Sequence, residues 1–271
     1  MRMRGWFLRV FRVVLVGGAA WLAFQWLEPR GLGWVVLLVA GLLVAMWIGL
    51  RAARIRGQRA EEARAERWAE ALMIPPRRPA AVRELNAELD ALDPSKPKQA
   101  HRFAHLSLIL AELLEADGEP EKALEALDRI DDESLAERMA AVVRHARAVS
   151  WLSAGDPASA RAALDELPGP CGDRAVDLRI RMMRGLIAAE EGDPEEALEI
   201  AQLARTEAGT DADLKLEARV LKAVALDAAG DPEDARKVLA ALEDEMLEVL
   251  HTLGLPRVRR LAGAILQERE D

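Results

Sequence analysis

The hydrophobic and polar residues of the chain follow two different patterns. Before residue 51 they form two long apolar stretches, and from about residue 80 apolar residues recur every three or four positions between charged ones. The second pattern is typical of amphipathic α-helices. We therefore expect an all-α chain with an apolar N-terminal part followed by helices that pack on one another.

The second apolar stretch has the properties of a membrane-spanning helix. Residues 32–50 carry no charge and would be about 28 Å long as a helix, close to the bilayer hydrocarbon thickness of about 30 Å. The first stretch, residues 8–27, reaches a similar length if Arg9 and Arg12 extend to the headgroups. We predict a two-helix transmembrane hairpin over residues 1–50. The alternatives are a buried soluble helix for the second stretch and a cleaved signal peptide for the first.

Arginines flank the predicted hairpin asymmetrically. One lies in the turn, at Arg30, and the others lie before the first span or after the second, at Arg2, Arg4, Arg9, Arg12, Arg51, Arg54, Arg56 and Arg59. Cytoplasmic flanks of membrane helices are enriched in such residues. We therefore predict a multi-pass protein of a bacterial-type inner membrane, with both termini in the cytoplasm.

Residues 51–79 form a predicted connection between the membrane and the rest of the chain. Residues 51–72 have the composition of a charged helix whose basic first half either touches lipid headgroups or is simply solvated. The run IPPRRP, residues 74–79, contains helix-breaking prolines. We expect a domain boundary there, followed by a capping helix at about residues 80–92.

A helix stop and start signal recurs along the following residues. Glycine suits the left-handed end of one helix, the acidic residue caps the next, and proline fits its first turn. The glycines are 37 or 38 residues apart. The signal is found at Gly118-Glu119-Pro120, Gly155-Asp156-Pro157, Gly192-Asp193-Pro194 and Gly230-Asp231-Pro232.

Small residues repeat with the same spacing. They stand seven residues before each glycine, at Ala111, Ala148, Gly185 and Ala223, and five residues after it, at Ala123, Ala160, Ala197 and Ala235. Paired helices can cross closely at such positions. The pattern over about residues 100–250 resembles the tetratricopeptide repeat, whose usual unit of about 34 residues is slightly shorter. The resemblance implies an α-solenoid of about four helix pairs with capping helices over residues 80–271.

The C-terminal residues are predicted to close this array. The second helix of the last pair is expected to continue to about Leu253. Pro256 then begins a final helix whose apolar residues Val258, Leu261 and Ile265 lie on one face. Repeat arrays need such a helix because the last unit has no following neighbour to cover its core.

Charge and cysteine content exclude several classes of function. Residues 1–93 carry 14 basic and 9 acidic side chains, and residues 94–271 carry 23 basic and 37 acidic ones. An acidic array is a poor partner for phosphate groups, so we predict no nucleic-acid binding. The single cysteine, Cys171, excludes an internal disulfide framework.

Few residues have a pattern typical of catalysis or metal binding. His101 and His105 are four residues apart and could face one metal ion, but no third ligand is near in sequence. Cys171 lies in a turn between repeats without a paired base, so we expect an exposed, unreactive thiol. We predict no enzyme activity, no metal, no cofactor and no small-molecule substrate.

The resemblance also implies a binding surface. In the tetratricopeptide family the first helix of each pair lines a concave face, and its apolar centre here suits a peptide or an amphipathic helix. The alternative is that these aliphatic side chains are buried between neighbouring repeats. The groove residues implied by the resemblance are His105, Leu108, Glu112, Val142, His145, Val149, Leu152, Arg179, Met182, Leu186, Val220 and Val224.

These features together predict a non-catalytic, membrane-tethered scaffold that binds a protein partner through the groove. One alternative is a structural subunit of a membrane complex, whose spans would pack closely through Gly17, Gly18 and Gly41. Another is an accessory protein of a membrane metabolic enzyme. Two spans followed by such repeats are similar in layout to bacterial membrane proteins associated with haem biosynthesis.

Overall fold

The computed structural model of the chain describes residues 63–270, and the predicted membrane spans lie outside this part. The described residues form helices and turns, with no strand. No helix among residues 63–270 combines the length and the apolar character of a membrane span. After a helix over residues 63–73 the elements are η2 (Pro75–Arg77), α3 (Arg78–Asp90), α4 (Pro97–Ala116), α5 (Pro120–Asp128), η3 (Asp132–Ser134), α6 (Glu137–Ser153), α7 (Pro157–Asp165), α8 (Arg174–Glu191), α9 (Pro194–Glu207), α10 (Ala212–Ala228), α11 (Pro232–Ala240), α12 (Asp244–Leu253) and α13 (Pro256–Glu270).

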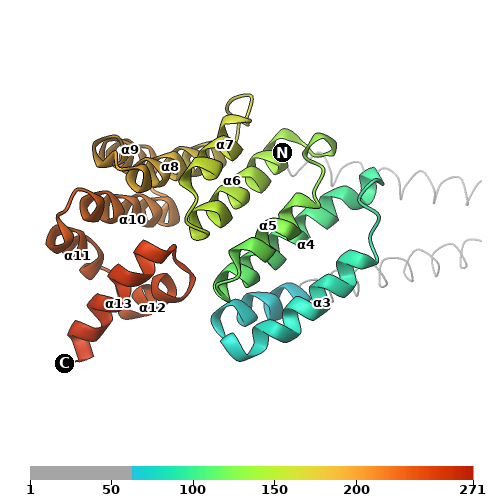
Figure 1. Cartoon of the computed structure of the whole chain (residues 1–271), viewed down its shortest axis with the longest axis horizontal. Coiled ribbons are helices and arrows are strands. Elements are labelled where there is room, and N and C mark those ends of the chain that lie inside the picture. The colour runs from blue at the N-terminus through green and yellow to red at the C-terminus, as the bar shows by residue number, and fades with distance from the viewer. Residues whose placement is uncertain (1–62, 271) are drawn as a thin grey trace, which may run out of the picture. The chain divides into compact units, whose positions relative to one another are not determined.

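Four consecutive helix pairs build the array within the compact unit Arg67–Asp271. The pairs are α4/α5, α6/α7, α8/α9 and α10/α11, and the two helices of each pair pack on each other. The first helices also contact one another in chain order, so α4, α6, α8 and α10 form one layer (Figure 1). We call this layer the inner layer. The predicted all-α solenoid of four pairs is confirmed.

The recurring turns have the predicted geometry. The four glycines, Gly118, Gly155, Gly192 and Gly230, all have positive φ, between 76° and 90°. The side chains of Asp156, Asp193 and Asp231 accept hydrogen bonds from the backbone N–H of the third residue of the next helix. Glu119, whose side chain is one carbon longer, makes no such bond. Each turn thus ends one helix and starts the next within three residues.

The difference between Asp193 and Glu119 leads to a stability prediction. Asp193→Ala should lower the free energy of unfolding by about 1 kcal/mol, because a backbone N–H of α9 loses its capping oxygen. Glu119→Ala removes an acidic residue at the equivalent position, where the side chain does not cap the helix, and should have little effect. Urea unfolding of both variants, followed by far-ultraviolet circular dichroism, checks the difference. Equal losses would contradict the capping role.

The small repeated positions are buried between packed helices. Ala123, Ala160, Ala197 and Ala235 are all fully buried. A Cβ atom placed on Gly185 of α8 would lie 2.9 Å from Leu221 Cδ2 of α10 and 3.1 Å from Ile200 Cγ2 of α9. Gly185 therefore touches both its paired helix and the next repeat. A side chain at this point would require the side chains of Leu221 and Ile200 to shift.

The N-terminal end of the array is covered by residues 67–73 and by α3. Trp68 and Leu85 are buried in one cluster with Phe103 and Leu110 of the first pair. The predicted capping helix is therefore α3, Arg78–Asp90. Residues 67–73 were expected to belong to the connecting segment, but they also contribute to this core.

Arg78 connects this covering layer to the first repeat. Its side chain is only 3% exposed. Nε and Nη2 donate to the main-chain oxygen of Leu72, and Nη1 donates to that of Ala116 and to Asp117 Oδ1, at 2.7–3.1 Å. The oxygens of Leu72 and Ala116 lie in the last turns of two helices, where no backbone N–H remains to satisfy them. One guanidinium therefore closes two helix ends.

The C-terminal end differs from the prediction. The second helix of the last pair does not continue to Leu253, because α11 ends at Ala240 and α12 starts at Asp244. Leu239 of α11 and Leu247 of α12 are both fully buried in one cluster with Leu261 of α13, so packing fixes the break. The predicted final helix is α13, and it packs against α10 and α11 at the end of the array.

Candidate protein-binding surface

The predicted groove residues differ in their burial and in their contacts. Leu152, Met182 and Val224 are buried between neighbouring repeats, which was the alternative interpretation, so their assignment to an open groove is corrected. Val142, Leu186 and Val220 are half-buried and pack on the same clusters. A cavity is lined by Leu108, Glu112, His145 and Val149. His105 is exposed and lies outside this cavity. Arg179 forms an ion pair with Glu217 at 2.9 Å.

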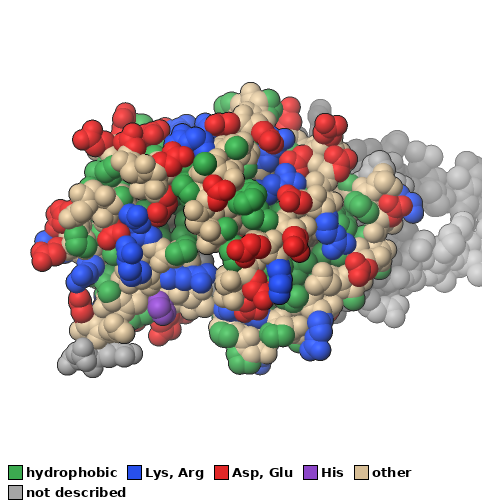
Figure 2. Space-filling model, in the orientation of Figure 1, with side chains coloured by type: hydrophobic (Ala, Val, Ile, Leu, Met, Phe, Trp, Pro, Cys, Tyr) green, Lys and Arg blue, Asp and Glu red, His purple; other side chains and the backbone are tan. Residues whose placement is uncertain are grey.

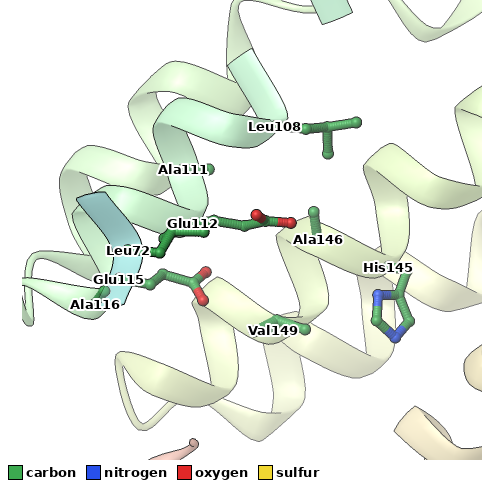
Figure 3. A pocket seen from close by; sticks show the side chains of 9 residues that line it. All are labelled: Leu72, Leu108, Ala111, Glu112, Glu115, Ala116, His145, Ala146 and Val149. Atoms are coloured by element: carbon green, nitrogen blue, oxygen red, sulfur yellow. The ribbon is translucent and has the colours of Figure 1, made fainter. Parts of the chain in front are cut away.

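The cavity lies between α4 and α6 and has a volume of about 290 Å³. Figure 3 shows Glu112 and Glu115 on α4 pointing into the space between the two helices, with Val149 and His145 on the facing helix. Leu72, Ala111, Ala116 and Ala146 complete the lining. Leu72 comes from the helix before the repeats, so a sequence analysis confined to the repeats does not include it.

The two carboxylates of the cavity differ in their surroundings. Glu112 is exposed at the mouth, whereas Glu115 is half-buried and accepts a hydrogen bond from the hydroxyl of Ser150 on α6. Burial raises the pKa of Glu115 to about 7, although the bond from Ser150 and the charge of Arg259 act in the opposite direction. A fraction of the Glu115 side chains is thus protonated at neutral pH.

The raised pKa of Glu115 predicts a pH-dependent stability. The folded chain binds a proton that the unfolded chain releases at its ordinary pKa of 4.5, so stability falls as the pH rises from about 4.5 through about 7. Glu115→Gln should stabilise the protein above pH ~7.5 by about 2 kcal/mol and change little near pH ~4. Urea unfolding at both pH values checks this. The exposed Glu199 on α9 supplies the control variant, Glu199→Gln, and an equal gain from it would contradict the prediction.

His145 faces the same space with a neutral ring. Desolvation lowers the pKa of His145, and the positive charge of Arg179 adds to this effect. Imidazole donates from one nitrogen and accepts at the other in this state. The cavity therefore combines aliphatic walls, a neutral imidazole and two acidic side chains.

The C-terminal hairpin α12/α13 lies against the inner layer. α12 contacts α4 of the first pair. Leu250 and Leu255 both pack on the apolar cluster that α8, α9 and α10 share. Leu255 also packs on the cluster of α6, α7 and α8, and Leu250 on that of α10 and α11. This hairpin covers part of the surface that was expected to be an open groove. No local feature of the sequence indicates it, because the contacts join residues far apart in the chain.

Arginines at the start of α13 bind the ends of the inner helices. Arg257 Nε lies 3.0 Å from Glu190 Oε1, near the end of α8. Arg260 Nη2 lies 2.7 Å from Asp227 Oδ2, near the end of α10. Positive charge is favourable at a helix C-terminus, where the dipole is negative. Ion pairs thus hold the hairpin against α8 and α10, two of the four inner helices.

Cys171 lies in the loop between α7 and α8, beside a second cavity of about 500 Å³. It is half-buried, not exposed as expected. Its backbone N–H donates to Asp177 Oδ1 at 2.7 Å, and burial raises the pKa of the thiol. Arg144 and Asp132, 3.1 Å apart, also line this cavity. The Arg144–Asp132 pair joins α6 of the second pair to η3, which follows the first pair, whereas Asp177 on α8 lies beside the thiol.

The remaining features are the distribution of potential metal ligands and of charge among residues 63–270. No group of three or more potential metal ligands occurs within these residues, and His101 and His105 are both exposed. Figure 2 shows acidic and basic side chains interspersed on one face of the array, without a broad basic patch on that face.

Comparison with protein families identifies the repeats. Four segments match the family described as tetratricopeptide repeat, at residues 104–129, 141–166, 178–202 and 216–241. Each segment covers most of an inner helix and all or most of its paired helix. The chain therefore contains four tetratricopeptide repeats, and the predicted resemblance is confirmed for this part. Repeats of this class generally mediate protein–protein interactions.

The other two comparisons add no relative. Neither the search of curated proteins nor the search of solved structures gives a match.

Proposed function

We propose that the chain is a non-catalytic scaffold that binds a protein partner at the inner layer of its repeats. The observation that carries this proposal is the open cavity between α4 and α6. It combines aliphatic side chains with carboxylates that solvent can reach. Binding sites for peptides commonly place a few polar groups in such an apolar depression.

Crosslinking from the cavity tests this function. A photoreactive amino acid replaces Leu108 in the full chain, and the matched control carries it at Leu203, a hydrophobic residue of α9 that is 47% exposed. We expect irradiation in cells to join a defined partner to position 108 and not to position 203. Recovery of the same set of proteins from both positions would contradict binding at the cavity.

We further propose that residues 1–50 tether this scaffold to a bacterial-type inner membrane, with both termini in the cytoplasm. The support is the uncharged stretch over residues 32–50 and the arginines on both sides of the hairpin. A tether raises the effective concentration of the repeats near membrane partners, so a modest affinity suffices. Membrane fractionation tests the tether: the chain should sediment with membranes and become soluble when residues 1–50 are removed.

A further inference from the structure

An arginine of the C-terminal hairpin lies at the rim of the α4–α6 cavity. Arg259 Nη2 donates to the main-chain oxygen of Glu115 at 3.1 Å, although the two residues are 144 positions apart. The side chain of Glu115 lines the cavity. The guanidinium of Arg259 thus binds the backbone at the end of α4 beside the cavity, the position that we call its rim. The contact of Arg259 indicates which chemical group can bind at the rim, namely a planar cation with several N–H donors.

The charges around the rim favour such a cation. Glu112 and Glu115 place two carboxylates on consecutive turns of α4. Among the residues that the structure describes, Glu112 forms no ion pair. The C-terminal end of α4, at Ala116, is already bound by Arg78, so the attraction for a further cation comes from the side chains of Glu112 and Glu115. Arg259 therefore binds the main-chain oxygen of Glu115 and leaves the carboxylate oxygens of Glu112 as further hydrogen-bond acceptors.

The walls of the cavity favour an apolar side chain beside the cation. Leu72, Leu108 and Val149 face the space from three different helices. A free cation would leave these walls in contact with water. A peptide segment that carries an aliphatic residue next to an arginine would cover the walls and neutralise the carboxylates at the same time.

Arg259 can leave the rim without loss of the core of the hairpin. Leu261, Ala262 and Ile265 of α13 are buried against α10, α11 and α12, away from the first repeat. Arg257 and Arg260 pair with carboxylates of α8 and α10 instead of α4. Arg259 contributes one hydrogen bond to the link with the first repeat, from Nη2 to Glu115, and a second one within the hairpin, from Nε to the main-chain oxygen of Gly254. Exchange of the bond to Glu115 for an equivalent bond from a partner is therefore a local event.

We propose that the α4–α6 cavity binds an arginine-bearing apolar segment of the protein partner, and that Arg259 occupies the rim in cis and competes with that segment. The proposal rests on the scaffold function above and adds the chemistry of the partner. The residues around Arg259 have this chemistry themselves, since residues 254–262 read GLPRVRRLA. The hairpin thus acts as an internal competitor for the site.

A peptide of residues 254–262, labelled with fluorescein, tests the competition by fluorescence anisotropy with the purified full chain. Arg259→Gln should bind this peptide about tenfold more tightly than the wild type, because the rim is no longer occupied in cis. Adding Glu112→Gln to that variant should weaken binding about tenfold, the effect of one lost charge-assisted contact. Arg260→Gln, which removes a pair with Asp227 only, is the matched control and should bind like the wild type.

Three results would overturn the proposal. The first is that the wild type and Arg259→Gln bind the peptide with equal affinity, and the second is that Arg259→Gln does not bind it. The third is that a peptide whose three arginines are replaced by glutamine binds as tightly as the original peptide. Far-ultraviolet circular dichroism of each variant, with Arg259→Lys as a milder replacement that should bind at an intermediate level, guards against misfolding. If crosslinking from position 108 still captures a partner in these cases, the scaffold function stands and only its proposed ligand chemistry fails.

Discussion

Replacing Gly185 with leucine is expected to lower the free energy of unfolding by about 3 kcal/mol, near the upper end of the usual cost of overpacking. Gly185 lies on α8 where this helix crosses α9 and touches α10. A Cβ atom alone would come within 2.9 Å of Leu221 Cδ2, a distance that side chains do not adopt. The remaining atoms of leucine would force α8 and α10 apart, and the repeats on either side would lose contact.

Urea unfolding of the purified full chain measures this effect. Gly192→Ala provides the comparison, because a Cβ atom there meets no atom within 4 Å and only the positive φ of 90° opposes it. That variant should lose about 1 kcal/mol. A loss for Gly185→Leu that is no larger than the loss for Gly192→Ala would show that the helices have room to separate.

Arg78→Ala is expected to lower the free energy of unfolding by a similar amount, about 3 kcal/mol. The substitution removes donors from the main-chain oxygens of Leu72 and Ala116 and from Asp117. These oxygens lie at helix ends without other intrahelical donors. The buried guanidinium would also leave a space that alanine does not fill.

The exposed Arg83 serves as the control for this prediction. Its Nε donates to the main-chain oxygen of Pro79 at 3.2 Å on the surface of α3, so Arg83→Ala should change the free energy of unfolding by less than about 0.5 kcal/mol. Arg78→Lys should recover part of the loss, because an ammonium group can reach some of the same oxygens. Equal stabilities of Arg78→Ala and Arg83→Ala would show that Arg78 does not join the two helix ends.

The repeats could be predicted from the sequence because their signals are local. A glycine that ends a helix, an aspartate that caps the next and a small residue at the crossing each act within a few residues. The break between α11 and α12 has no such signal. Ala241, Leu242 and Glu243 are compatible with a continuous helix, and the chain turns there because Leu239 and Leu247 must enter the same core.

The cavity was predictable only in part for a related reason. The order of the repeats placed Leu108, Glu112, His145 and Val149 on the inner helices, and they do meet. The same reasoning from repeat positions also placed Met182 in the groove, although Met182 is buried. The spacing of apolar residues along a helix does not distinguish residues that line the open face from residues that contact the next repeat. Arg259 reaches the first repeat from 144 residues away, and no periodicity describes that distance.

The contact between the two ends of the array has a consequence for copy number. In most solenoids each module meets only its neighbours, so modules can be inserted or deleted without a change elsewhere. Here α12 and Arg259 contact α4. The last hairpin can make these contacts only if the number of modules between it and α4 stays the same. Duplication or loss of one module would carry Arg259 away from Glu115. Selection for this closure would hold the count at four.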